Sequence, residues 1–335
     1  MTKYFKKTLV AAAVAGAVAA GIPGTASAYV YGLSSLDITN FSITGLPSTS
    51  VTTYTFTETN TATLNGTSTI QSANCNGTVN PSVTTTCGTS PVLDPLAAQL
   101  GTPTGQNNFG FVGTGVEYAR ADSIISTAQL VNGTPSSINT IAEDNLITGT
   151  NASDSAQLQS TTNLTFTVGT TTSFSLAFLA DVDQRVAISN TGGSSQSNVQ
   201  ATFRLTRTDG SGGFILWNPD GTISAGDCQV SGIAGATCVE TADGGGAAQG
   251  SLNNTIATGV NPSDITYSYN PSADFNPYGI SIANLPAGTY SLSLSTVVSD
   301  DKTRIQAVPE PVSLALVGVA LLGIAGTARR RKHKA

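Results

Sequence analysis

The chain has 335 residues, only 10% of them charged, and a formal net charge of -6. Between Tyr29 and Val308 it carries 6 Lys or Arg residues against 19 Asp or Glu residues, so the remaining basic charge lies near the two ends. An acidic body this poor in cations excludes nucleic acid as a partner, because contacts to phosphate need Lys and Arg.

The first 28 residues have the pattern of a cleaved secretion signal. Three lysines within the first seven residues precede a short apolar run, and Ala26 and Ala28 supply the small residues of a cleavage site. The apolar run is shorter than the roughly 20 residues that span a bilayer, which disfavours a retained membrane helix. The sequence therefore predicts a signal peptide over residues 1–28, export by the secretion machinery, and a mature chain that starts at Tyr29.

The body consists of short runs in which apolar residues alternate with Ser and Thr, the period that marks half-buried strands. The clearest runs lie at residues 51–57, 164–168, 173–180, 202–206 and 290–295. Turn sequences such as Asn65-Gly66 and Asp209-Gly210 separate the runs. We therefore predict one all-β extracellular domain over residues 29–305, an antiparallel β-sandwich resembling a jelly roll. The spacing of apolar residues at 91–100 predicts one short surface helix.

Four cysteines are present, Cys75, Cys87, Cys228 and Cys238. Export makes disulfides the expected state, and four cysteines allow three connectivities. We favour the local pairing, Cys75 with Cys87 and Cys228 with Cys238, which closes two short polar loops. A structural zinc site is disfavoured, because the spacing is not CxxC and the body has no histidine to complete one.

Asp181 and Asp183 follow the clearly alternating run at 173–180, which predicts a strand. If that strand continues through residue 183, both carboxylates lie on one of its faces. Paired carboxylates of this kind can supply half of a calcium site, which Glu143, Asp144 or Asp154 would complete. The alternative is a solvated acidic strand end. Calcium is the only metal or cofactor for which the sequence offers candidate ligands, and a second, looser set is Asp264, Asp274 and Asn276.

The last 30 residues, 306–335, form a tail with three parts in order. Pro309, Glu310 and Pro311 come first, and the prolines exclude helix and regular strand there. An uncharged apolar run over 312–328 follows, at the short limit of what spans a bilayer. A basic cluster, which the positive-inside rule would hold in the cytoplasm, ends the chain with Arg329, Arg330, Arg331 and Lys332.

This arrangement resembles the PEP-CTERM sorting signal of Gram-negative bacteria. The resemblance covers only the tail and implies recognition by an exosortase, a membrane enzyme that cuts at or near Pro309-Glu310-Pro311. It also implies transient anchoring in the inner membrane, then release to the cell surface or beyond, where such proteins accompany exopolysaccharide and biofilm. The alternative is a permanent single-pass anchor.

The composition of the body favours a non-catalytic role. The only histidine, His333, lies in the tail, so the body has no imidazole base and no Ser-His-Asp triad. We therefore expect an exported surface or matrix protein. The alternatives are a carbohydrate- or calcium-binding module and a two-carboxylate hydrolase, which would need carboxylates that converge in a cleft.

Overall fold

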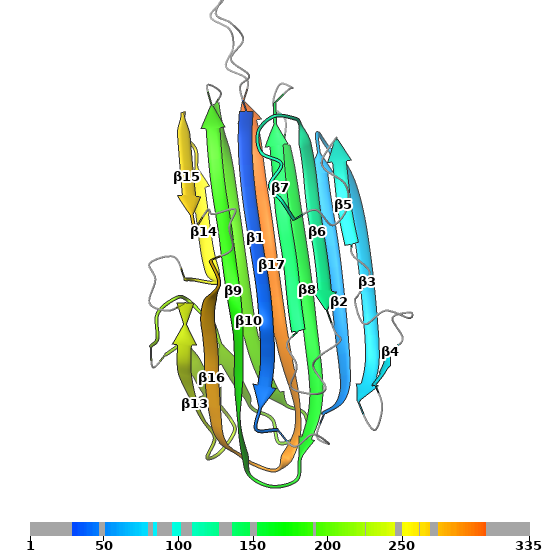
Figure 1. Cartoon of the computed structure of the whole chain (residues 1–335), viewed down its shortest axis with the longest axis vertical. Helices are drawn as coiled ribbons and strands as arrows, with labels where there is room; N and C mark the ends of the chain where they lie inside the picture. Colours follow the sequence, from blue (N-terminus) through cyan, green and yellow to red (C-terminus); the bar gives the residue numbers. More distant parts are fainter. Residues whose placement is uncertain are drawn as a thin grey trace, which may run out of the picture.

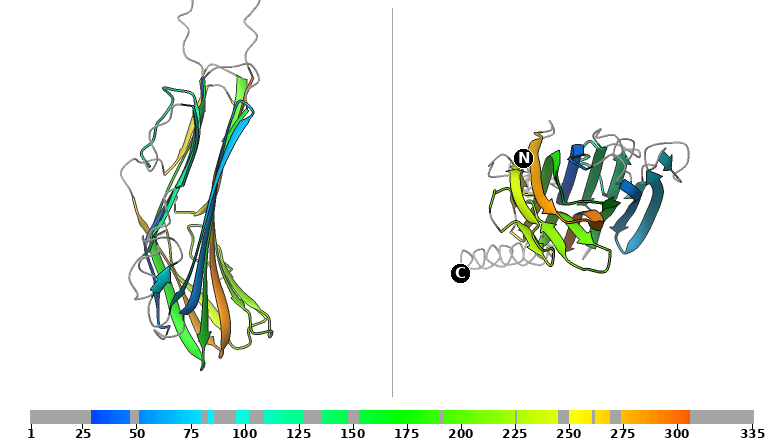
Figure 2. Two further views of the ribbon diagram at one scale, coloured as in Figure 1. Left: turned by 90° about the vertical axis from the view of Figure 1, so that its right-hand side faces the viewer. Right: turned by 90° about the horizontal axis from the view of Figure 1, so that it is seen from below.

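The computed structural model describes most of residues 29–305 as two layers of strands. It describes residues 29–46, 51–79, 83–85, 96–101, 109–126, 136–147, 153–189, 192–224, 226–244, 250–260, 262–268 and 274–305. These residues contain 17 strands, all joined by antiparallel pairings, and the strands form two sheets that face each other (Figures 1 and 2).

The first sheet has eight strands. Seven lie in the order β13 (Thr237–Asp243), β16 (Asn276–Leu285), β9 (Thr172–Ser189), β1 (Tyr29–Thr44), β7 (Ser136–Leu146), β6 (Tyr118–Ser126) and β5 (Leu96–Gly101), and β15 (Ser263–Tyr267) also pairs with β9.

The second sheet has nine strands. Eight lie in the order β12 (Cys228–Ser231), β11 (Phe214–Trp217), β10 (Gly192–Arg207), β17 (Gly288–Ile305), β8 (Ser153–Val168), β2 (Val51–Leu64), β3 (Thr67–Val79) and β4 (Val83–Thr85), and β14 (Asn253–Thr258) also pairs with β10.

The prediction of an all-β, antiparallel body is confirmed, and the described residues contain no α-helix. The helix expected at 91–100 is wrong in its second half, because residues from Leu96 to Gly101 form β5, paired with β6. The apolar residues at 91–100 can line one side of either a helix or a strand, and pairing with β6 makes residues 96–101 a strand. The expected signal-peptide and C-terminal helices lie outside the described residues. Within the part of the chain that is described, no helix is long and apolar enough to cross a membrane.

Alternation places the described side chains of β2 in turn on the surface and in the interior. Tyr54 and Phe56 are buried, while Thr53, Thr55 and Thr57 face outward. The Asn65-Gly66 turn then joins β2 to β3 with positive φ at both residues, 51° and 81°, as a two-residue hairpin of type I′ requires. The predicted turn is confirmed, and it sets the register of these two strands.

One half of the interior is aromatic. Phe203 on β10 stacks on Phe178 of β9 with ring centroids 5.1 Å apart, and Trp217 of β11 lies 4.8 Å from Phe203. Tyr278 on β16 stacks on the other side of Phe178 at 5.2 Å. These four rings come from both sheets and are each at most 3% exposed, so they hold the two layers together.

The first described residue and the last lie at the same end of the sandwich. In the strand register Tyr29 pairs with Ser189, at the end of β9, and Ile305 pairs with Gly192, at the start of β10. Figure 1 shows this end at the top, where β1 begins and β17 finishes. Both segments that the sequence predicts to be processed therefore adjoin one end of the body.

Candidate functional site: a hydroxyl-rich sheet face and its hollow

The outer surface of the second sheet is covered mainly by uncharged polar side chains, with Arg204, Val297 and Asp301 among the exceptions. We call this surface the hydroxyl face, and its rows run across β2, β8, β17 and β10. In one row Thr57 pairs with Thr161, and Thr161 with Ser295, which pairs in turn with Thr202. The other outward residues include Thr55, Thr59, Thr61, Thr63, Asn163, Thr165, Ser291, Ser293, Ser299, Asn198 and Gln200.

Hydrogen bonds between neighbouring strands fix many of these hydroxyl groups. The Ser194 and Thr303 hydroxyls lie 2.8 Å apart, and those of Thr63 and Ser68 lie 2.9 Å apart. The Thr255 hydroxyl donates to Asn198 Oδ1 at 2.8 Å. Short side chains held in this way lose little further conformational freedom when a ligand binds, which favours binding through hydrogen bonds.

A hollow of about 560 Å³ lies at one end of the hydroxyl face, near the end where β17 finishes. Its lining comes from β2, β10, β14 and β17, and consists of Thr63, Ser194, Ser195, Gln196, Ala257, Thr258, Gly259, Asp301, Lys302 and Thr303. Of the two charged residues, Asp301 is exposed, whereas the Lys302 side chain points into the interior and is fully buried.

The hollow therefore offers hydroxyl and amide groups, which both donate and accept hydrogen bonds, and one exposed carboxylate, which only accepts. Its volume lies within the roughly 300–1,000 Å³ usual for small-ligand pockets. No lining residue is aromatic, so a sugar ring would be held by hydrogen bonds rather than by stacking. From the sequence alone these residues are predicted only as polar positions that face outward. Pairing between strands that are distant in the chain brings them together around the hollow.

Between the sheets, the half of the interior near this end is polar. The Ser195 hydroxyl of β10 donates to the Tyr31 carbonyl of β1 at 2.8 Å, and that of Ser197 donates to the Leu33 carbonyl at 2.6 Å. The Ser34 hydroxyl donates to Asp300 Oδ1 at 2.9 Å. Small side chains let the two layers approach closely here, and side-chain hydrogen bonds replace apolar packing.

The two predicted calcium ligands, Asp181 and Asp183, lie on β9 and are each 6% exposed. The backbone N–H of Asp274 donates to Asp181 Oδ2 at 3.3 Å, and Asp37 of β1 is the cross-strand neighbour of Asp181. Burial raises the pKa of Asp181, and burial together with the Asp181 charge raises the pKa of Asp37 to about 7. Asp181 is thus brought near Asp37 and Asp274, while the strand neighbour of Asp183 is Ser35.

The other acidic residues named for calcium have different partners. Glu143 accepts from Arg120 at 2.6 Å, and Asp264 pairs with Arg185 at 2.7 Å. Asp144 points into the interior and contacts Lys302. Within the described residues, no three His, Cys, Asp or Glu side chains are grouped so that they could hold a metal ion. Calcium binding at Asp181 and Asp183 stays a prediction.

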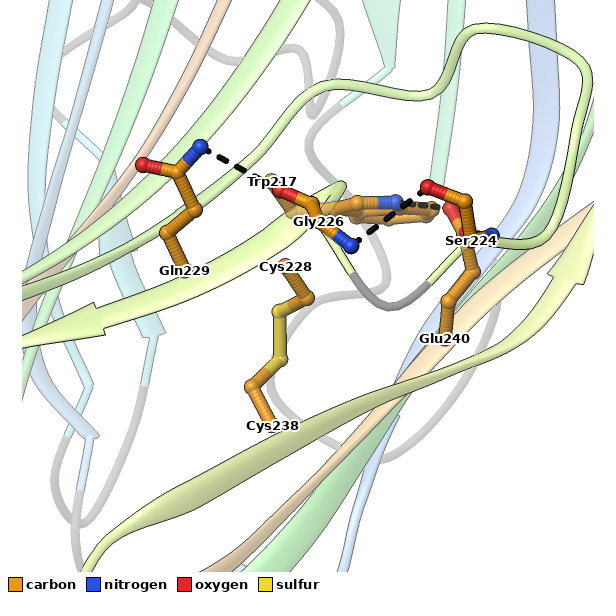
Figure 3. The surroundings of a disulfide bond; sticks show 7 residues. All are labelled: Trp217, Ser224, Gly226, Cys228, Gln229, Cys238 and Glu240. Carbon is orange, nitrogen blue, oxygen red and sulfur yellow. Dashed lines mark hydrogen bonds between the residues drawn. A yellow bond between two sulfur atoms is a disulfide. The ribbon is translucent and has the colours of Figure 1, made fainter.

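The predicted disulfide between Cys228 and Cys238 is confirmed (Figure 3). Cys228 is on β12 of the second sheet and Cys238 on β13 of the first, so the bond joins the two layers along one edge. Beside it, Trp217 Nε1 donates to Glu240 Oε1 at 2.5 Å and closes the same edge. The other predicted pair, Cys75 with Cys87, falls on residues whose side chains lie outside the described part of the chain.

The residues predicted to direct sorting also lie outside the described residues: Ala26, Ala28, Pro309, Glu310, Pro311, Arg329, Arg330, Arg331 and Lys332. Comparison of the chain with protein-family models, curated proteins and solved structures found no match. The fold and the surface thus define an antiparallel β protein with two facing sheets, one of which carries a broad hydroxyl face.

Proposed function

We propose that this chain is an exported, non-catalytic protein of the cell surface or extracellular matrix. An exosortase-type enzyme would cut the tail at or near Pro309-Glu310-Pro311 after the basic cluster has halted export in the inner membrane. The observation that carries the proposal is the tail itself, in which Pro-Glu-Pro, an apolar run and a basic cluster follow one another.

Two features of the body support this proposal. Strands run from Tyr29 to Ile305, so the folded part fills the interval between the proposed signal cleavage and the proposed sorting tail. The disulfide between Cys228 and Cys238 is also typical of proteins that mature outside the cytoplasm. A surface of fixed hydroxyl groups suits a protein surrounded by hydrated polysaccharide in a matrix or biofilm.

Replacing Pro309, Glu310 and Pro311 with alanine tests the proposed processing in the native host. We expect the altered chain to remain in the membrane fraction while the wild-type body is released or transferred to the surface. A matched control replaces three residues of the hydroxyl face, Thr55, Thr57 and Thr59, and should be processed like the wild type. Equal release of the Pro-Glu-Pro variant would contradict sorting through this motif.

The hollow on the hydroxyl face favours a second candidate function, the binding of a neutral polysaccharide. Its uncharged donors and acceptors match the hydroxyl groups of sugars, and the exposed Asp301 carboxylate could accept from two adjacent sugar hydroxyls. The excess of acidic residues on the body disfavours anionic polymers, because like charges repel.

Affinity electrophoresis in a native gel that contains hydroxyethyl cellulose tests the second candidate. We expect the polymer to retard the wild-type protein and Asp301→Ala to lose most of that retardation. Asp264→Ala removes an exposed carboxylate that pairs with Arg185 away from the hollow, and it should be retarded like the wild type. If the polymer retards no form, or retards the wild type and Asp301→Ala equally, the hollow is not the binding site for this class of polymer.

A further inference from the structure

A lysine and an aspartate meet inside the sandwich without a hydrogen bond to any other described residue. Lys302 projects inward from β17 of the second sheet, and Asp144 projects inward from β7 of the first. The Nζ atom of Lys302 contacts Oδ1 of Asp144, and both side chains are fully buried. Neither Nζ nor either Asp144 oxygen makes a hydrogen bond to any described residue.

This isolation is unusual for a buried ion pair. Taking two charges out of water costs several kcal/mol per ion, and natural pairs offset the cost with further hydrogen bonds to the charged groups. Three orphaned atoms in one contact indicate that the two side chains are not held there as an ordinary salt bridge.

The neighbouring strand leaves space for the lysine to reach the aspartate. Gly32 on β1 pairs with Asp144 in the strand register, so it lies beside the contact. A Cβ atom added at Gly32 would lie 2.8 Å from both Cε and Nζ of Lys302, closer than carbon and nitrogen atoms pack. A side chain at this position would push the end of the lysine side chain aside, so glycine leaves room for the contact.

Burial also favours the reactive form of the lysine. It lowers the pKa of Lys302 well below its usual value, which favours the neutral amine, a nucleophile. Passing the proton to Asp144 gives a neutral amine beside a neutral carboxylic acid and removes the desolvation penalty of the charges. Asp300, two residues earlier on β17, faces the same interior, where its Oδ1 accepts from the Ser34 hydroxyl.

We propose that Lys302 and Asp144 are joined by an intramolecular amide bond between Nζ and Cγ. The lone pair of Nζ attacks Cγ of the protonated carboxyl group and forms the carbon–nitrogen bond. The nitrogen then gives up one proton, the carbon–oxygen bond to the hydroxyl group breaks, and the hydroxyl leaves with that proton as water. No oxidant or other reactant is needed.

The bond would join the two sheets near the end where β17 finishes, whereas the disulfide joins them along the edge formed by β12 and β13. Force applied to the C-terminal end of the chain would then be shared between β17 and the first sheet. This inference does not depend on the proposed function, because the bond forms within the body wherever the protein is delivered.

Peptide mapping of the purified wild-type protein, after reduction and alkylation of its cysteines, is the direct test. Digestion with trypsin and a second protease should leave a branched peptide that contains Lys302 and Asp144. Its mass should equal the two linear peptides less one water, and trypsin should not cut after Lys302. Two separate linear peptides and cleavage after Lys302 would overturn the proposal, and this result does not depend on whether any variant folds.

Variants then identify the groups involved. Lys302→Met and Asp144→Ala should abolish the branched peptide, while Gly32→Ala should lower the fraction of linked chains. Asp264→Asn changes an exposed carboxylate of the first sheet that pairs with Arg185, and it should leave that fraction unchanged. A branched peptide that survives Lys302→Met or Asp144→Ala would contradict this assignment.

Discussion

Replacing Phe203 with alanine should lower the free energy of unfolding by about 3–5 kcal/mol. The Phe203 ring is 1% exposed and lies between Phe178 of the first sheet and Trp217 of the second. Removing it leaves a cavity where rings from both layers meet, and the stiff backbones of long paired strands cannot collapse to fill it. Chemical denaturation of the purified body measures the change.

Thr202→Ala is the matched control, because Thr202 is next in the chain and points to the hydroxyl face instead of the interior. It should change the free energy of unfolding by about 0.5 kcal/mol or less, as is usual for surface positions. Equal losses in the two variants would contradict the assignment of inner and outer faces to β10.

The second large effect is a loss of stability with rising pH that depends on Glu58. Glu58 is fully buried on β2, and burial raises its pKa to about 8, although the nearby Ser123 hydroxyl partly opposes the shift. A glutamate in the unfolded chain has a pKa of about 4.3. Between these values the folded protein keeps a proton that the unfolded chain has lost, so the free energy of unfolding decreases as pH rises.

The expected slope from Glu58 is about 1.4 kcal/mol per pH unit, which accumulates to about 5 kcal/mol across the interval. Its contribution is complete below the unfolded pKa and is lost as the pH passes the folded pKa. Asp37 and Asp243, whose pKa values burial raises to about 7, add slopes of the same sign.

Denaturation of the wild type and of Glu58→Gln at a series of pH values measures this slope. The glutamine variant should have a flatter profile, because its side chain is neutral at every pH. Asp301→Asn, which changes an exposed carboxylate, should reproduce the wild-type profile. Parallel profiles for the wild type and Glu58→Gln would contradict a buried, protonated Glu58.

Local patterns were sufficient to predict the strands and one disulfide. The alternating apolar residues of a strand show which of its faces is buried, and the structure confirms that Phe174, Leu176 and Phe178 are buried. Cys228 and Cys238 are ten residues apart, so the chain itself keeps them close. The helix expected near Leu96 was wrong, because the spacing of apolar residues does not show that β6 is available to pair with this segment as β5.

Contacts between distant strands were beyond sequence reasoning. The sequence offers Asp144 as a calcium ligand and Lys302 as one of six cations of the body, yet the two meet across the interior. The alternation of Leu292 and Leu294 with serines, continued along β17, places Lys302 inside. The inward position of Lys302 could therefore be predicted from the sequence, but its partner Asp144 is set by the packing of one sheet on the other. The hollow on the hydroxyl face depends on the same long-range pairing.

The most direct test of the central proposal is the intact mass of the protein recovered from outside the cell. We expect a body that begins at Tyr29 and ends at or near Pro309-Glu310-Pro311, without the apolar run or the basic cluster. Recovery of a mature chain that still carries Arg329 to Lys334 would contradict sorting and cleavage by an exosortase-type enzyme.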